Sequence, residues 1–328
     1  MNNQTVVVDG ASGYVGSHIT AELSRLGFDV RCLVRPQVSA EDAQLLESTG
    51  ARLYRGSLGA PDSQKILAEA FSGAGTAVHT IGSVAPRKGE TLSDLHIHQT
   101  ASFVDCCKKN GVGKIIMISS LGTRKDASAN YHKTKWLAED IVRKSGISAL
   151  ILRPALIVGR TFGHRNSKLV ARYLKLIDEK STVPLIAGGG NRIQPIFIGD
   201  VVKAVIAGVV REGEDRTVFG QSLDIAGPEA MTMRQFVERL AKEVAGQTRT
   251  FKAVSPAMAQ IAAVFCELIQ DVPMVSADQI KLALEDNVCL DNGLESVLQI
   301  KPTDLSQAFA SYQDERQAPK HGAPQEVS

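Results

Sequence analysis

Two residues, Tyr131 and Lys135, have the types and spacing of an acid/base pair. They are four positions apart in a stretch expected to be helical, so they share one face of the helix. A phenol titrates at about pH 10, and a neighbouring ammonium group favours the phenolate. Shortly before them, Ser120, or its neighbour Ser119, offers a hydroxyl that can hydrogen-bond a substrate oxygen. We predict a catalytic set of Ser120, Tyr131 and Lys135, although Tyr and Lys at this spacing are often incidental.

A glycine-rich turn near the N-terminus reads GASGYVG over residues 10–16. It follows an expected strand and precedes a helical pattern, which is the context of a pyrophosphate-binding turn. The first glycine permits the tight turn, the second admits the phosphates and the third lets the helix pack on the strand. The open N–H groups at the start of the helix favour an anion. We predict dinucleotide contacts from Gly10, Ser12, Gly13, Tyr14, Val15 and Gly16; the alternative is a turn that binds nothing.

Arg35 follows the second expected strand, where the adenosine ribose usually lies. An acidic residue at this place accepts from the ribose hydroxyls and favours NAD. A guanidinium instead pairs with a 2′-phosphate. Since no carboxylate stands next to Arg35, we predict NADP(H) over NAD(H); the alternative is an arginine that only faces solvent.

The residues around these motifs alternate between strand and helix patterns. Strands separated by whole helices form βαβ units, so we predict an α/β fold with a doubly wound parallel Rossmann sheet. The expected strands are Thr5–Asp9, Val30–Val34, Arg52–Arg55, Ala77–Ile81, Lys114–Ser119 and Ala149–Leu152, and the expected helices are Val15–Leu26, Ala40–Thr49, Pro61–Phe71, Leu92–Asn110 and Tyr131–Ser145.

The regular alternation of strand and helix patterns ends after Pro154, where a smaller lobe is expected to begin. We assign residues 1–155 to the Rossmann domain, completed by about 194–226. Residues 156–193 and 227–312 form a smaller, mostly helical C-terminal lobe for a substrate or partner. Asp200, Thr232 and Ser276 are expected to cap helices. Residues 313–328 lack apolar content and periodicity, which predicts a disordered tail.

The composition excludes several classes of protein. A hydrophobic share of 44% and a charged share of 22% are typical of a soluble globular chain, and a net charge of +2 gives no field for nucleic acid. Five cysteines without a C-x-x-C pair predict a reducing compartment and no metal site. No apolar run is long enough for a transmembrane segment, and there is no room for a signal peptide. We expect a cytoplasmic protein, or one held peripherally on the cytoplasmic face of a membrane through a partner complex.

Together these motifs resemble the short-chain dehydrogenase/reductase superfamily in its extended or atypical branch. Further matching segments read LRPALIVG from residue 152, QPIFIGDVV from 194 and LDIAGP from 223. The segment DQIKLALEDNV at 278–288 is similar to bacterial relatives of the NAD(P)H-binding accessory subunit of respiratory complex I. The resemblance implies bound NAD(P)(H), with Tyr131 and Lys135 beside the nicotinamide, Lys135 on its ribose and a further contact at Pro154.

Some positions depart from the family's pattern. The family often has an Asp after the third strand that meets the adenine; here Ser57 and Leu58 follow Gly56, so that contact is weakened or replaced. We still assign Ser57 and Leu58 to the cofactor. His79 is an unusual polar residue in the fourth strand and is expected to be a hydrogen-bonded core histidine. The acidic pair of dehydratase relatives is absent after Ser120, which argues against dehydration.

Two functions remain open. The first is an NADP-dependent oxidoreductase or epimerase that acts on a small-molecule substrate through Ser120, Tyr131 and Lys135. The second is a non-catalytic accessory or assembly subunit of a larger membrane-associated, respiratory-type complex. The nearly uncharged run Pro256–Ile269 favours the second if it is a partner surface, and is neutral if it packs on its own domain.

Overall fold

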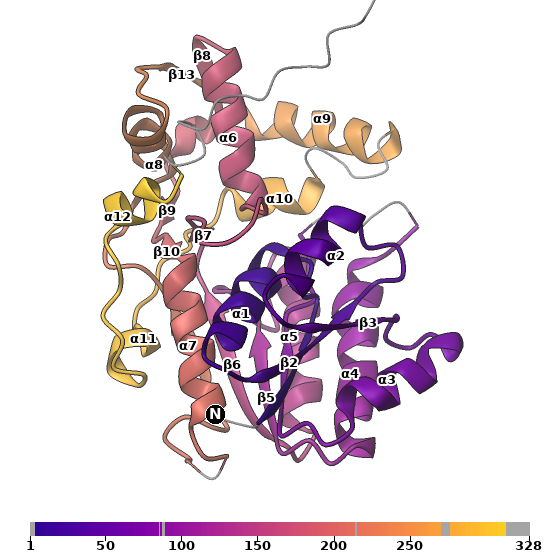
Figure 1. The fold of residues 1–328 in the computed structure, drawn as a ribbon. Coiled ribbons are helices and arrows are strands. Elements are labelled where there is room, and N and C mark those ends of the chain that lie inside the picture. The colour runs from indigo at the N-terminus through magenta and orange to yellow at the C-terminus, as the bar shows by residue number, and fades with distance from the viewer. Residues whose placement is uncertain (1–3, 85, 87–88, 214, 270–275, 313–328) are drawn as a thin grey trace, which may run out of the picture.

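A computed structural model describes residues 4–312 apart from 85, 87–88, 214 and 270–275 (Figure 1). The predicted tail, 313–328, lies outside the described residues. The centre is a seven-stranded sheet in the order β11-β6-β5-β4-β1-β2-β3, with every pair parallel. The strand order reverses between β1 and β4, which confirms the doubly wound Rossmann fold. The strands are β1 (Thr5–Asp9), β2 (Asp29–Val34), β3 (Arg52–Arg55), β4 (Thr76–His79), β5 (Lys114–Ile118), β6 (Ser148–Pro154) and β11 (Ser222–Ile225).

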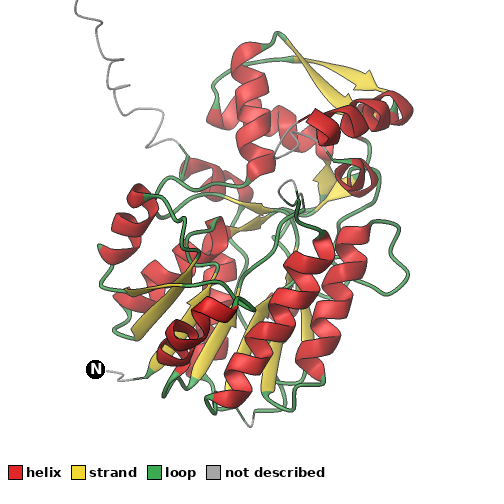
Figure 2. Cartoon of the chain, turned by 90° about the vertical axis from the view of Figure 1, so that its right-hand side faces the viewer, coloured by secondary structure: helices red, strands yellow, loops and turns green. Residues whose placement is uncertain are grey.

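Helices cover both faces of this sheet, as the βαβ pattern predicted (Figure 2). One face carries α1 (Tyr14–Arg25), α2 (Ala40–Glu47) and α7 (Ile198–Val210), and the other carries α3 (Gln64–Phe71), α4 (Gln99–Lys109) and α5 (Asn130–Arg143). The helix expected over Leu92–Asn110 is present, and after its first two residues it contains a π-helical turn, Asp94–His98, which continues into α4.

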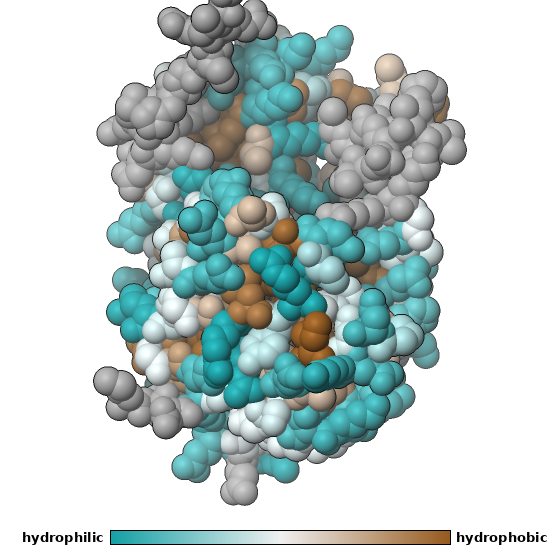
Figure 3. All heavy atoms as spheres, turned by 45° about the vertical axis from the view of Figure 1, so that its right-hand side comes forward, coloured by the Kyte–Doolittle hydropathy of each residue, from teal (hydrophilic) through white to brown (hydrophobic). Residues whose placement is uncertain are grey.

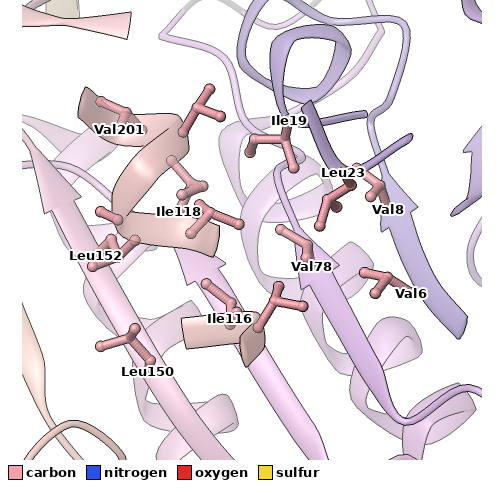
Figure 4. Packing of buried hydrophobic residues seen from close by; sticks show 14 of the residues in the cluster. Val6, Val8, Ile19, Leu23, Val78, Ile116, Ile118, Leu150, Leu152 and Val201 are labelled. Atoms are coloured by element: carbon pink, nitrogen blue, oxygen red, sulfur yellow. The ribbon is translucent and has the colours of Figure 1, made fainter. Parts of the chain in front are cut away.

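Alternate residues of the central strands point to opposite faces. Val6 and Val8 of β1 pack toward Ile19 and Leu23 of α1 (Figure 4), whereas Val7 belongs to the cluster on the other face. Both clusters are sealed from solvent, which explains why the inner strands read as continuous apolar runs.

A smaller lobe lies beyond the carboxyl ends of the sheet strands (Figure 2). Its helices were expected, but the parallel pairing of β8 with β13 was not. Those strands are short and half exposed, so their pattern is weak. Helix α11 (Gly293–Ser296) packs instead on β11 of the sheet, where Leu294 joins the core of the Rossmann domain (Figure 1). The other elements after β6 are β7 (Ile157–Val158), α6 (Lys168–Glu179), β8 (Thr182–Ile186), β9 (Arg192–Ile193), β10 (Ile196–Phe197), β12 (Met231–Thr232), α8 (Met233–Arg239), a π-helical turn (Leu240–Val244), β13 (Thr250–Val254), α9 (Pro256–Ile269), α10 (Ala277–Leu282) and α12 (Leu305–Ala310).

Two of the three predicted caps are confirmed, and one is wrong. Thr232 and Ser276 each form a capping box. Asp200 lies inside the first turn of α7, whose N-cap is Phe197. Its fully buried carboxylate instead accepts hydrogen bonds from the N–H of Thr303 at 2.6 Å and from the Thr303 hydroxyl at 2.9 Å. Asp200 therefore fastens the C-terminal segment to the Rossmann domain.

Replacing Asp200 with Ala should lower the free energy of unfolding by about 2–4 kcal/mol, because the N–H of Thr303 loses its acceptor and Lys203 loses its partner. Chemical denaturation measures the loss. The matched control is Asp304→Ala, since Asp304 is exposed and its side chain makes no capping hydrogen bond. That change should stay within about 0.5 kcal/mol, and equal losses in the two variants would contradict the role of Asp200.

Candidate functional site

The glycine-rich turn has the geometry that close approach requires. Gly10 has φ +57°, in the left-handed region. A Cβ on Gly16 would lie 2.4 Å from the carbonyl oxygen of Gly10, and one on Gly13 would lie 3.1 Å from the same atom. Helix α1 then begins at Tyr14 with no capping side chain and no acidic residue in its first turn. Its first N–H groups can therefore bind an anion.

The side chain of Tyr14 ties this turn to the loop after β7. Its hydroxyl donates to the carbonyl of Gly159 at 2.5 Å, and burial raises the pKa of the phenol well above its usual range. Because the hydroxyl of Tyr14 is already hydrogen-bonded within the protein, only the backbone of Tyr14 is left to make the predicted nucleotide contact. Ser12 and Val15 are half-buried on either side of the turn.

His18, which the sequence did not single out, fastens the same loop to α1. Its Nδ1 donates to the carbonyl of Tyr14 at 2.7 Å, and its Nε2 accepts from the N–H groups of Thr161 and Phe162 at 3.1 and 3.2 Å. Burial lowers the pKa of His18 to about 4, in keeping with a neutral ring that both donates and accepts.

His79 is a core histidine, as predicted. It is fully buried, its Nδ1 is hydrogen-bonded to the carboxylate of Asp9, and its Nε2 lies 2.8 Å from the hydroxyl of Thr100. The other carboxylate oxygen of Asp9 accepts from the N–H groups of Thr80 at 2.6 Å and Ile81 at 3.3 Å. Asp9 and His79 thereby hold the loop after β4 beside the glycine turn.

Lys135 lies one helical turn after Tyr131 on α5, and the residue is only 3% exposed at the ends of β4 and β5. Nζ donates to the carbonyls of Ile81 at 3.3 Å and Ile118 at 3.2 Å. Burial lowers the pKa of Lys135 to about 8, and nearby carboxylates oppose the shift. A Cβ on Gly82 would lie 2.6 Å from Nζ, so a larger residue there would displace the end of the Lys135 side chain.

A buried carboxylate, Glu139, decides which serine faces the site. Ser119 donates to Glu139 Oε1 at 2.5 Å. Arg153 donates to both oxygens of the same carboxylate at 2.8 and 2.6 Å, and Arg143 donates to Oε2. Because Ser119 is buried and occupied, the half-buried hydroxyl of Ser120 is the one that can meet a substrate.

The phenol of Tyr131 lies between Ser120 and a histidine that the sequence did not reveal. Burial raises the pKa of Tyr131, and its hydrogen bond with Ser120 acts in the opposite direction. The ring of His96 contacts it edge-on with centroids 5.3 Å apart, and His96 Nδ1 lies 2.8 Å from the hydroxyl of Thr134. Burial and the charge of Lys135 lower the pKa of His96 to about 2. No local pattern marks His96; the π-helical turn before α4 brings it to α5.

Arg35 lies exposed directly after β2, as the sequence predicted. The neighbouring strand β3 ends in Arg55, which is also exposed and is the register partner of Val34. Two arginines therefore stand at adjacent strand ends, and the second was not recognised from the sequence.

The remaining predicted contacts lie at the same edge of the sheet. Ser57 follows β3, is half-buried and donates its N–H to the hydroxyl of Ser63 at 3.0 Å, whereas Leu58 is buried. Pro154 ends β6, and its carbonyl accepts from the N–H of Leu121 at 2.9 Å. These residues thus lie at strand ends on either side of the glycine turn and of the Tyr131–Lys135 pair.

Within the part of the chain that the structure describes, no group of three or more His, Cys, Asp or Glu side chains is arranged to hold a metal ion. In the same part, no helix combines the length and the apolar character that a membrane crossing requires.

A model of the NmrA-like family matches residues 2–169. Among curated proteins, an Arabidopsis thaliana NADH dehydrogenase [ubiquinone] 1 alpha subcomplex subunit 9 is 23% identical over 298 residues, which cover 88% of this chain and 71% of that protein. A ceramide reductase from Caulobacter vibrioides is 30% identical over 154 residues, which cover 47% of this chain and 46% of that protein.

Among solved structures, MoeE5 in complex with UDP-glucose and NAD superimposes with a TM-score of 0.69 at 20% identity, over 94% of this chain and 97% of that one. The likeness confirms the Rossmann-type fold. The relatives confirm the resemblance to the extended short-chain dehydrogenase/reductase superfamily and, within it, to the complex I accessory subunit.

Burial of the Lys135 ammonium predicts how the stability of the fold depends on pH. Its pKa of about 8 in the folded chain lies below the ordinary 10.5, so the unfolded chain holds this proton more tightly. From about pH 8 to about pH 10, the wild type should gain stability relative to Lys135→Met, and below about pH 8 the difference between them should be constant. Denaturation of both proteins across this range measures it.

The matched control is Lys175→Met, because the side chain of Lys175 is 72% exposed on α6. Its stability difference from the wild type should not vary with pH in the same window. A flat difference for Lys135→Met would show that its ammonium is solvated rather than buried.

Proposed function

The chain belongs to the NmrA-like family, and we propose that it is an NADP(H)-dependent oxidoreductase or epimerase acting on a small molecule. The observation that carries this proposal is the arrangement of Ser120, Tyr131 and Lys135. Interaction with Ser120 opposes the effect of burial on the pKa of Tyr131, and the side chain of Lys135 is buried one helical turn from Tyr131. A purely structural helix face does not require a buried lysine, which is costly to desolvate.

The glycine turn fits a dinucleotide. Glycine at residues 13 and 16 removes the Cβ atoms that would meet the carbonyl of Gly10, and the uncapped start of α1 offers N–H groups to a pyrophosphate. Gly10, Ser12, Gly13, Val15, Gly16 and the backbone of Tyr14 would hold this part of the cofactor. Ser57, Leu58 and Pro154 would contact it from the neighbouring strand ends.

The preference for NADP(H) is proposed from charge. Arg35 and Arg55 are exposed at the ends of adjacent strands, and β2 runs directly into Arg35 without an acidic residue. Guanidinium groups pair with phosphate through charge-assisted hydrogen bonds, whereas NAD recognition at this place normally uses a carboxylate.

The chain's own residues would handle the proton. Ser120 orients the substrate oxygen, and Tyr131 gives a proton to that oxygen or takes one from it. Lys135 holds the nicotinamide ribose and, through its positive charge, favours the phenolate. A bound nicotinamide would supply or accept the hydride. The fixed carbonyls of Ile81 and Ile118 keep the ammonium from swinging away from this position.

The second candidate is an accessory or assembly subunit held at a membrane-associated complex. The observation that favours it is the alignment of a mitochondrial NADH dehydrogenase subunit with 88% of this chain. On the face shown in Figure 3 polar residues dominate and apolar patches are small. Helix α9 exposes Met258 and Ile261, at 68% and 72%, and would be the partner surface in this case.

Tyr131→Phe tests the catalytic proposal. The wild type is first screened for NADPH oxidation with a panel of aldehydes, ketones and imines. The variant should lose roughly 10²–10⁴-fold in kcat with the best substrate, because the proton donor is gone. Its dissociation constant for NADPH should stay within about twofold, since the phenol adds no charge to the site. Tyr173→Phe on α6 is the control, and full turnover in Tyr131→Phe would refute the mechanism.

Arg35→Asp tests cofactor choice. Loss of the guanidinium should weaken NADPH binding by roughly ten- to a hundredfold, and the new carboxylate should improve NADH binding. Titration of the quenched or enhanced nucleotide fluorescence gives both constants. Arg25→Asp, at the far end of α1, is the control. Unchanged NADPH affinity in Arg35→Asp would remove the basis for the NADP(H) preference.

A further inference from the structure

Helix α5, which carries Tyr131 and Lys135, has no N-terminal cap of its own. Its N-cap is Ala129, which makes no side-chain hydrogen bond, and its first turn contains no acidic residue. The first N–H groups of a helix have no partner within the helix, so they need an acceptor from elsewhere. The helix that carries the acid/base pair therefore depends on another part of the chain at the end where Tyr131 lies.

The acceptor comes from the small lobe. Asp278 of α10 accepts a hydrogen bond from the N–H of Tyr131 at 2.6 Å, across 147 residues of chain. Asp278 is 8% exposed, and a carboxylate at this end of a helix also meets the favourable end of the helix dipole. Its own position is fixed by the capping box of Ser276 and Gln279 that begins α10.

The same segment holds the rest of the loop that leads to α5. Glu285 accepts from the hydroxyl of Ser128 and from Arg124 at 3.4 Å. Asn287 donates from Nδ2 to the carbonyl of Leu121 at 3.1 Å, directly after Ser120. Residues 278–287 thus contact the loop at its start, near its end and at Tyr131 itself.

We infer that Asp278 is a positioning residue for Tyr131, and that the segment 278–287 sets the geometry of the loop carrying Ser120 and Tyr131 from the small lobe. This inference deepens the proposed function and rests on it for the role of the phenol. The segment that resembles the complex I accessory subunit would then hold the Ser120 and Tyr131 loop in place, whichever substrate the site binds.

The inference links the small lobe to the chemistry. Ile280 of α10 is buried against Ala259 and Ala263 of α9. A molecule that binds the small lobe and shifts α9 would move α10, and with it the carboxylate that holds the start of α5.

Selective labelling of the five tyrosines tests the inference without a known substrate. The amide of Tyr131, labelled with 15N and assigned through Tyr131→Phe, reports the hydrogen bond. The phenol, labelled with 13C, reports its own titration. In Asp278→Ala the amide should exchange about five- to tenfold faster. The pKa of Tyr131 should fall toward its usual range, because water then reaches a phenol whose pKa burial had raised.

Asp278→Asn keeps an acceptor oxygen and should change both signals less than Asp278→Ala does. The matched control is Asp286→Ala, which removes a carboxylate of the same segment that accepts the N–H of Arg192 at 2.7 Å. It should leave both Tyr131 signals as in the wild type.

An unchanged amide in Asp278→Ala would overturn the inference. So would a faster amide with an unaltered phenol titration, since Asp278 would then be a helix cap without influence on the reacting group. These signals do not depend on turnover. Failure of the proposed function, seen as full activity in Tyr131→Phe, would therefore be recognised separately.

Discussion

The carboxylate of Glu139 is the constraint on which the site depends. A fully buried charge is tolerated only when donors surround it, and Glu139 finds them in Ser119 at the end of β5, in Arg153 on β6 and in Arg143 on its own helix. These contacts fix how α5 lies along the sheet. Since Lys135 precedes Glu139 by one turn and Tyr131 by two, the same contacts place the ammonium and the phenol at the carboxyl edge of the strands.

The loop after β4 connects Lys135 to the glycine-rich turn. Asp9, at the end of β1, holds the N–H of Ile81, and the carbonyl of Ile81 accepts from Lys135. The next residue, Gly82, lies directly against the ammonium, so a side chain there would displace the end of Lys135. A change at the glycine turn therefore reaches Lys135 through one residue, Ile81, and a few hydrogen bonds. The buried pair of Asp9 and His79 makes this connection stiff, because breaking it would leave the Oδ2 oxygen of the Asp9 carboxylate buried without a donor.

Local pattern was sufficient for the parts of the molecule that depend on neighbours in sequence. Periodicity gave the strands and helices of the Rossmann domain, and the glycine turn could be recognised from the strand before it and the helix after it. The N-cap prediction for Asp200 was wrong because a good capping residue within the first turn of a helix looks the same in sequence as a cap. His96, His18, Arg55 and Asp278 could not be found, since each acquires its partner only after segments far apart in the chain have packed together.

We propose that this chain contains a working NADP(H) site rather than a permanently filled structural one. The most direct test is to purify the protein gently from its native source, release and identify the bound nucleotide, and time its exchange against added NADPH and NADH. The account predicts a nucleotide that exchanges readily, with NADPH competing better than NADH. A nucleotide that is retained and does not exchange, or a folded protein that binds neither form, would contradict it.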